Sequence, residues 1–452
     1  MAIVCKSQIG YPVYTLSFTP KKHKLLVGGG GGSGRSGVDN AITLYQVTTD
    51  LSLEVISRHV FSKEEDGVMS LAVNPKEKTL VAGVNQPEAL VKAGRNLNCR
   101  SFILDGGNLV ALEPFQTVQS TDPIHCQKVA RFSPSGQYLA TGTTDGYFQI
   151  WQWPSLKPAG PAIQSSREIL DADISHDDQH AAFLTTEACT IMALPSAAVV
   201  MAIPCPQIDK KAAAQFRACR FGTGAAAGRF FTLVNAKNRK RCWINLWSAV
   251  PASAGKPAAW RLTRSQAVAP RSATCMTLSA NGQLLAVALA DFSVIVLHAR
   301  TLKRVYRSVT PHDFSVTSLG FSEDATYLAS GAIDGTVVLH DVRGLQATRS
   351  WCTTLIAIAS LLVVLAVALL ALVDVDHRGQ VVLAPLVHRL RQTMADVDLQ
   401  RQVEVLRAAT ERSWEAANAA LLHASASSSS LLSAATSSVS SLAAAATEHA
   451  EL

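Results

Sequence analysis

The feature that most constrains the fold of this chain is a repeat in its first 350 residues. Each copy runs from a strand of alternating apolar residues through a polar turn into a second strand, and through another turn into a third. The clearest copies are "KVARFSPSGQYLATGTTDGYFQIWQW" (Lys128 to Trp153), "TCMTLSANGQLLAVALADFSVIVLH" (Thr274 to His298) and "SVTSLGFSEDATYLASGAIDGTVVLHDV" (Ser315 to Val342). Fainter copies begin near Tyr14, Met69, Leu170 and Arg217, which makes seven in all.

Seven strand-rich copies at intervals of roughly 40 to 60 residues predict a β-propeller with four strands in each blade. One blade cannot bury both of its faces alone, and stacking in a closed ring buries them. The sequence therefore predicts an all-β fold over residues 1–345. The repeat resembles the WD-repeat family, although "IWQW" and "LHDV" replace its Trp-Asp dipeptide. We expect a strand near Ala2 to Ser7 to pair into the last blade and close the ring.

Charge and cysteine content argue against several classes of function. The net charge of +7 is spread over 452 residues, and aromatic residues do not interleave with the basic ones, so we expect no nucleic-acid partner. The nine cysteines form no C-x-x-C pair and no zinc spacing, which indicates reduced thiols in a cytosolic domain. No nucleophile–base pair points to a hydrolase or an oxidoreductase.

One segment breaks the soluble pattern. "CTTLIAIASLLVVLAVALLALV", Cys352 to Val373, is an uncharged run of 22 residues. As a helix it would span about 33 Å, which matches a bilayer core of about 30 Å. A buried core helix is the alternative, but the run is apolar all round and is flanked by Arg349 and Asp374. We therefore predict a transmembrane helix over residues 352–373 and a tail over residues 374–452.

Cysteine placement suggests the orientation of this span. Basic residues on its two sides do not decide the matter, but all the cysteines lie before the span or at its start. The N-terminus is too polar for a signal peptide, so we expect a cytosolic propeller and a lumenal tail, a single-pass type II arrangement.

The tail carries two weaker patterns. A short amphipathic helix is expected around Leu399, Val403 and Leu406, followed by a low-complexity Ser/Ala segment typical of disorder. The final "HAEL" resembles a lumenal retrieval signal with Ala450 in place of Asp, which would make the retrieval receptor a partner; chance similarity is the alternative.

A glycine-rich loop lies inside the first repeat, in "KLLVGGGGGSGRSGVDNAITLYQV", Lys24 to Val47. Gly29 to Ser36 has the spacing of a phosphate-binding P-loop, but Arg35 stands where the lysine is required. A P-loop also needs a helix directly after it, and "NAITLYQV" has the β-branched alternation of a strand. The sequence therefore argues against nucleotide binding by this loop.

Two interpretations of the loop remain. Consecutive glycines lose much backbone entropy on ordering, so one is a floppy hairpin connection. The other is a tight fold in which several backbone carbonyls converge on a weakly hydrated monovalent cation. In that fold Asp39 and Asn40 would fix the far end of the loop through side-chain bonds to backbone amides.

Three stretches carry a resemblance to a known family: "GYPVYTLSF" (Gly10 to Phe18), the glycine loop with its G-[VI]-x-N end, and "HDFSVTSLGFSEDATYLAS" (His312 to Ser330). With seven blades and one C-terminal span, residues 1 to about 375 resemble the endoplasmic-reticulum guanine-nucleotide exchange factors for the Sar-type small GTPase that starts COPII coat assembly. Animal members are called prolactin regulatory element-binding proteins. The resemblance implies residence in the endoplasmic-reticulum membrane, a GTPase partner, and exchange without bond chemistry.

The resemblance also implies roles for loop residues. In that family the loop binds a potassium ion, mainly through backbone carbonyls, and presses on the GTPase. The implied exchange loop is Gly37, Val38, Asp39 and Asn40, and the implied potassium ligands are Gly29, Gly30, Gly31, Gly32 and Asn40. The alternative function is a non-catalytic, membrane-tethered propeller scaffold with a disordered loop that binds a protein partner.

Two further groups of residues are interpreted as structural. His312 precedes a strand of the last repeat and Asp334 lies in a later turn, so we expect them to share a buried hydrogen bond rather than contact a partner. Trp151 and Trp153 are expected to pack rather than form a binding surface.

Overall fold

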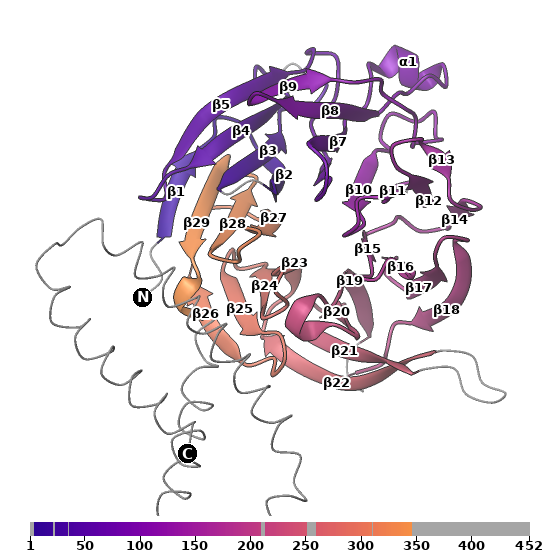
Figure 1. Ribbon diagram of the computed structural model, residues 1–452, viewed down its shortest axis with the longest axis vertical. Coiled ribbons are helices and arrows are strands. Elements are labelled where there is room, and N and C mark those ends of the chain that lie inside the picture. The colour runs from indigo at the N-terminus through magenta and orange to yellow at the C-terminus, as the bar shows by residue number, and fades with distance from the viewer. Residues whose placement is uncertain are drawn as a thin grey trace, which may run out of the picture. The chain divides into compact units, whose positions relative to one another are not determined.

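The computed structural model describes residues 4–20, 23–34, 36–208, 213–250, 259–309 and 311–345. Seven antiparallel sheets stand in a ring around one axis (Figure 1). The seven-bladed propeller predicted from the repeat is confirmed. Each of the seven copies supplies the first three strands of one blade, beginning at its innermost strand.

In blades one to four the strands follow one another in sequence from the axis outward. Blade one holds β2 (Val13–Phe18), β3 (Lys24–Gly29), β4 (Ala41–Val47) and β5 (Leu53–Val60); blade two holds β6 (Ser70–Val73), β7 (Thr79–Gly83), β8 (Cys99–Asp105) and β9 (Asn108–Ala111); blade three holds β10 (Gln127–Phe132), β11 (Tyr138–Thr143), β12 (Tyr147–Gln152), β13 (Lys157–Pro158) and β14 (Ile163–Gln164); blade four holds β15 (Asp171–Ile174), β16 (His180–Leu184), β17 (Ala188–Ala193) and β18 (Ala198–Pro204).

Blades five and six repeat this order, and blade seven takes its outermost strand from the N-terminus. Blade five holds β19 (Ala214–Phe221), β20 (Arg229–Ala236), β21 (Cys242–Val250) and β22 (Ala259–Ala269); blade six holds β23 (Ala273–Leu278), β24 (Leu284–Leu289), β25 (Val294–His298) and β26 (Arg304–Ser308); blade seven holds β27 (Val316–Phe321), β28 (Tyr327–Ala332), β29 (Thr336–Asp341) and β1 (Val4–Gln8).

The middle strands of each blade are buried on both faces, because each blade is covered by a neighbour on either side. The strand β24, "LLAVAL", is buried at every position, whereas β26 at the rim, "RVYRS", is buried at none. One core cluster joins Leu233 and Ile244 of blade five to Leu285 and Ile295 of blade six. Continuous apolar runs in these strands therefore reflect blade stacking rather than a one-sided sheet.

The ring is closed by β1. It pairs antiparallel with β29, with Val4 opposite His340 and Gln8 opposite Thr336. The predicted closing strand is thus confirmed, at Val4–Gln8. The following segment enters the core between the last and first blades through Tyr11, which is 2% exposed.

Local departures from the repeat have local causes. The helix α1 (Glu88–Lys92) lies in the connection between β7 and β8. The outer strand of blade three is broken into β13 and β14, because Pro158 and Pro161 have no N–H to donate to a ladder. Short 3-10 turns occur at Gly224–Ala226 and Arg343–Leu345.

The predicted span, residues 352–373, and the predicted tail, residues 374–452, lie outside the described residues. Within the part that the structure describes, no helix has the length and apolar character needed to cross a bilayer. Eight of the nine cysteines lie in that part, and each is a free thiol.

Deleting residues 1–8 should destabilise the whole ring, since it removes β1 and leaves the edge of β29 unpaired. Five residue pairs are lost, and at about 0.5–1.5 kcal/mol net for each ladder bond we expect a loss of a few kcal/mol in the free energy of unfolding. Thermal melts and size-exclusion chromatography would report a lower Tm and association through the free edge. As a control, Lys6→Ala breaks only the exposed 2.8 Å ion pair with Asp313 and should cost under about 1 kcal/mol. An unchanged Tm in the deletion would contradict a closing role for β1.

Candidate functional site

The glycine loop connects two neighbouring strands of blade one. Gly29, at the end of β3, pairs with Val13 on one side and Ala41 on the other. The strand β4 follows the loop, so the strand predicted after it is confirmed and the helix of a P-loop is absent there. The loop leaves the blade at the end where the innermost strand begins.

Asn40 holds the loop in shape. The residue is buried, with 2% of its surface exposed. The Oδ1 atom accepts the N–H of Gly32 at 2.9 Å, and Nδ2 donates to the Gly32 carbonyl at 3.1 Å and to the Glu65 carbonyl at 2.8 Å. The side-chain bond from Asn40 to a backbone amide, expected from the sequence, is present. These three bonds tie the loop to itself and to the connection between blades one and two.

Two of the glycines are required by close approach. A Cβ atom on Gly29 would lie 1.9 Å from the carbonyl oxygen of Pro12. Gly30 has a φ of +146°, and a Cβ there would lie 2.2 Å from Oδ1 of Asn40. A side chain at Gly29 would therefore collide with the backbone of Pro12, and one at Gly30 would push the loop away from Asn40.

The connection from β5 to β6 supports the loop from the second blade. Its Phe61 N–H donates to the Asn40 carbonyl at 2.9 Å, and the Glu65 carboxylate pairs with Arg100. Burial raises the pKa of the nearby Asp66 carboxyl, and hydrogen bonds from the backbone N–H groups of Gly67 and Ser33 oppose that rise. Sequence reasoning missed Glu65 and Asp66, because nothing local links them to a loop 25 residues earlier.

The remaining predicted exchange residues lie at the exposed side of the loop. Gly37 is exposed, and Val38 is half-buried against the core of the first blade. Among the described residues, no backbone amide donates to the Asp39 carboxylate, contrary to expectation; the carboxylate lies 3.1 Å from Nη2 of Arg58. That guanidinium is drawn inward by the ring of Tyr11, 5.4 Å away, so Asp39 faces β5 rather than the loop.

The backbone carbonyls of the predicted potassium ligands differ in whether they already accept a hydrogen bond. The Gly29 carbonyl accepts the N–H of Val68 at 3.4 Å, and that of Gly32 accepts Nδ2 of Asn40. No described residue donates a hydrogen bond to the carbonyls of Gly30 or Gly31. Among the described residues no three His, Cys, Asp or Glu side chains gather as metal ligands, so the oxygens offered here suit a weakly hydrated cation.

Other connections open at the same end of the blades as the loop, and several expose apolar side chains. Phe314 is 61% exposed in the connection from β26 to β27, and its ring stacks on Phe292 at 6.3 Å. Ile333, between β28 and β29, is 42% exposed. The loop therefore shares its face of the ring with apolar side chains of blades six and seven.

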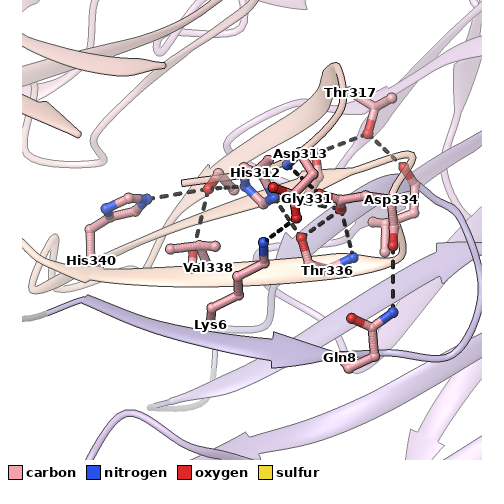
Figure 2. Close-up of polar contacts among 12 residues, drawn as sticks. Lys6, Gln8, His312, Asp313, Thr317, Gly331, Asp334, Thr336, Val338 and His340 are labelled. Atoms are coloured by element: carbon pink, nitrogen blue, oxygen red, sulfur yellow. Dashed lines mark hydrogen bonds and ion pairs between the residues drawn. The ribbon is translucent and has the colours of Figure 1, made fainter. Parts of the chain in front are cut away.

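His312 is part of a buried network in the last blade, not of this face (Figure 2). The residue is 1% exposed; Nδ1 lies 2.7 Å from Oγ1 of Thr336 and Nε2 lies 2.8 Å from Oγ of Ser330. Asp334 is 3.7 Å from Nδ1, and Thr336 links the two by donating to Asp334 at 2.5 Å. The structural role of His312 is confirmed, but the direct bond to Asp334 is wrong.

A second histidine completes that network. His340 is fully buried, with Nε2 3.2 Å from Ser330 Oγ and Nδ1 3.3 Å from the Tyr306 hydroxyl. In blades three and five the corresponding places hold Trp151 and Trp247, which donate to Thr141 at 2.8 Å and Thr232 at 2.9 Å. Packing of Trp151 is thus confirmed.

Trp153 also packs rather than forming a binding surface. Its ring meets Phe132 edge-on at 5.0 Å, and Nε1 donates to Glu77 at 2.9 Å.

Comparison with known proteins agrees with the fold and with the family resemblance. A family model described as "WD domain, G-beta repeat" matches residues 113–152 and 303–341. A SEC12-like protein 2 of Arabidopsis thaliana is 23% identical over 308 residues, which cover 67% of this chain and 72% of that protein. The guanine nucleotide-exchange factor SEC12 of Mus musculus is 23% identical over 410 residues, covering 78% of this chain and 94% of its own length.

The chain is similar to the SEC12 proteins over most of its length. The SEC12 exchange factor of Candida glabrata is likewise 24% identical over 357 residues, covering 74% of this chain and 71% of that protein. The resemblance stated from the sequence is therefore confirmed, and the similarity to SEC12 extends over most of the chain.

Asn40→Ala should loosen the glycine loop without unfolding the ring. The change removes three side-chain bonds and leaves the Gly32 amide without its acceptor, at a cost of about 1–3 kcal/mol. We expect hydrogen exchange in residues 28–47 to accelerate about tenfold or more, measured by mass spectrometry. Asn108→Ala, at the exposed first position of β9, is the matched control. Equal exchange in both variants would rule out the role given to Asn40.

The two buried histidines should make the ring acid-sensitive. Burial lowers the pKa of His312 to about 4 and that of His340 to about 3, from an ordinary value of 6.5. Below pH 6.5 these two histidines are protonated in the unfolded chain but stay neutral in the folded ring. Stability is therefore full above pH 6.5 and falls toward pH 4, by up to about 2.7 kcal/mol per pH unit for two sites.

Chemical denaturation at pH 7, 6 and 5 measures this slope. His340→Gln keeps a hydrogen-bonding side chain but cannot titrate, so the slope should fall by about half of the contribution of the two sites. An identical slope in the variant and the parent would show that His340 is not held neutral by the fold.

Proposed function

We propose that the chain is a guanine-nucleotide exchange factor for a Sar-type small GTPase and starts COPII coat assembly at the endoplasmic reticulum. The observation that carries the proposal is the glycine loop held by Asn40 on a face with exposed apolar side chains. Relatives named as guanine nucleotide-exchange factors, which align with most of this chain, support it. The nucleotide then lies in the partner, since the loop lacks the helix of a P-loop.

Exchange requires differential binding rather than bond chemistry. The factor lowers the barrier to GDP release by binding the nucleotide-free GTPase more tightly than the GDP-bound form. Gly37 and Val38, on the exposed side of the loop, contact the GTPase, and Asn40 keeps the loop in the shape that makes this contact. Phe314 and Ile333 extend the contact along the same face.

Potassium is part of the proposal as a structural ion. The carbonyls of Gly30 and Gly31 accept no hydrogen bond from described residues and are the best-placed ligands, with Gly29, Gly32 and Asn40 completing the set. When bound, the ion supplies positive charge that offsets the repulsion between converging carbonyl oxygens. Asn40 also fixes the loop backbone through its three side-chain bonds.

The proposal includes an anchor. Residues 352–373 cross the endoplasmic-reticulum membrane once, with the propeller cytosolic, so exchange takes place at the membrane where the coat assembles. The tail, residues 374–452, is lumenal and its final "HAEL" is read by the retrieval receptor. The length and apolar character of the span support this placement.

The full chain should accelerate GDP release from a Sar-type GTPase at least tenfold, measured with a fluorescent GDP analogue. Asn40→Ala should lose most of this acceleration, because the loop no longer holds its shape, and Asn108→Ala should keep it. Replacing potassium by sodium at equal ionic strength should weaken release by the parent chain.

Each arm separates a different part of the proposal. No acceleration by a folded, monodisperse chain would reject exchange and favour a membrane-tethered scaffold. Equal rates of GDP release in potassium and sodium would reject the potassium site but leave the exchange activity standing. Full activity in Asn40→Ala would place the exchange surface outside the glycine loop.

A further inference from the structure

The centre of the ring contains a cavity of about 270 Å³, lined by the innermost strands of all seven blades. This volume is just below the usual range for small-molecule pockets, roughly 300–1,000 Å³. Basic side chains outnumber acidic ones in the lining of this cavity. Four basic side chains and one carboxylate line it: Lys128, Arg131, Arg217, Arg220 and Asp171.

Two of the four basic groups are neutralised locally. Arg220 Nη1 lies 2.6 Å from Asp171 Oδ2, and Lys128 Nζ lies 2.9 Å from Glu168. Asp171 also accepts the Cys219 N–H at 3.1 Å, so its Oδ2 atom is shared by two donors. The carboxylate of the nearby Asp173 accepts a hydrogen bond from the Phe221 N–H at 2.7 Å.

Arg131 is poorly neutralised. Its Nη2 is 3.6 Å from Oδ1 of Asp171, beyond hydrogen-bond distance, and its Nε atom is buried with no hydrogen-bond partner in the described part of the chain. The side chain is 37% exposed, and this exposed part lines the cavity. Burial lowers the pKa of Arg131, and the charge of Arg220 lowers it further. A buried, unpaired guanidinium donor normally has a partner.

Arg217 carries the remaining charge. It lines the same cavity from β19, two blades from Arg131, and no described residue forms an ion pair or a hydrogen bond with its guanidinium. Counting Glu168 and Asp173 as well, four cations face three carboxylates, so the cluster keeps one positive charge in excess. Both under-neutralised groups are arginines, whose planar donors match the oxygens of a phosphate.

We propose that the central cavity binds a small phosphate-bearing molecule, held by Arg131 and Arg217 with Lys128 at the margin. An anion there accepts from the exposed part of the Arg131 side chain and neutralises the excess charge of the cluster. The limited volume favours phosphate or a small phosphate monoester over a nucleotide. This site does not depend on the proposed exchange activity.

Calorimetric titration of the full chain with inorganic phosphate, at constant ionic strength set with chloride, tests the proposal. A second titration uses glycerol 3-phosphate. Binding of either probe is expected for the parent chain, with a rise in Tm as the probe is added. Tighter binding of glycerol 3-phosphate identifies a monoester as the ligand, and tighter binding of phosphate identifies the free ion.

Arg217→Gln and Arg131→Gln should each weaken binding at least tenfold, which is about 1.4 kcal/mol. Arg261→Gln, on the exposed outer strand β22, should bind as the parent does. Arg217→Gln removes a side chain with no partner among the described residues, so its fold is expected to persist, as circular dichroism would show. No binding to the parent at 10-millimolar order of concentration, or equal binding in Arg217→Gln and Arg261→Gln, would overturn the proposal.

Discussion

Closure of the ring is the constraint on which the rest of the structure depends. A single four-stranded blade has two apolar faces, and only a complete circle leaves no face exposed. The chain completes the circle with β1, a strand from its N-terminus that pairs beside β29. Every other feature follows from this arrangement: strands buried on both faces, connections gathered at the two ends, and innermost strands that line a common cavity.

The candidate exchange loop depends on two blades. Its ends belong to blade one, but Asn40 also donates to Glu65, and Phe61 donates back to Asn40, both in the connection that begins blade two. The spacing of neighbouring blades therefore sets the shape of the loop. A glycine loop in an isolated hairpin would lack this second support.

The repeat could be predicted from sequence because its evidence is local. Alternating strands and Asn-Gly or Asp-Gly turns recur, and closure by the N-terminal strand follows from the need to protect an edge. The role of Asn40 could also be predicted, since Asn bonds readily to nearby backbone amides. The predicted partner of Asp39 is wrong because Arg58 binds its carboxylate. His312 and Asp334 are neighbours as expected, but Thr336 bridges them, through contacts that only the folded blade creates. The basic residues of the central cavity do share a pattern, "KVARF" at residues 128–132 and "RACRF" at residues 217–221, but only the closed ring shows that these strands line one cavity.

The order of the glycine loop rests on a narrow balance. Three consecutive glycines of the loop itself, Gly30 to Gly32, each lose about 0.5–1 kcal/mol more on ordering than alanine would, or roughly 1.5–3 kcal/mol together. The three hydrogen bonds of the Asn40 side chain stabilise the loop by about 0.5–1.5 kcal/mol each, or roughly 1.5–4.5 kcal/mol together. Because these ranges overlap, the loop is held with little surplus by its own contacts. Any further contact made only in the ordered state, whether to a cation or to a protein partner, therefore has a large effect on its population.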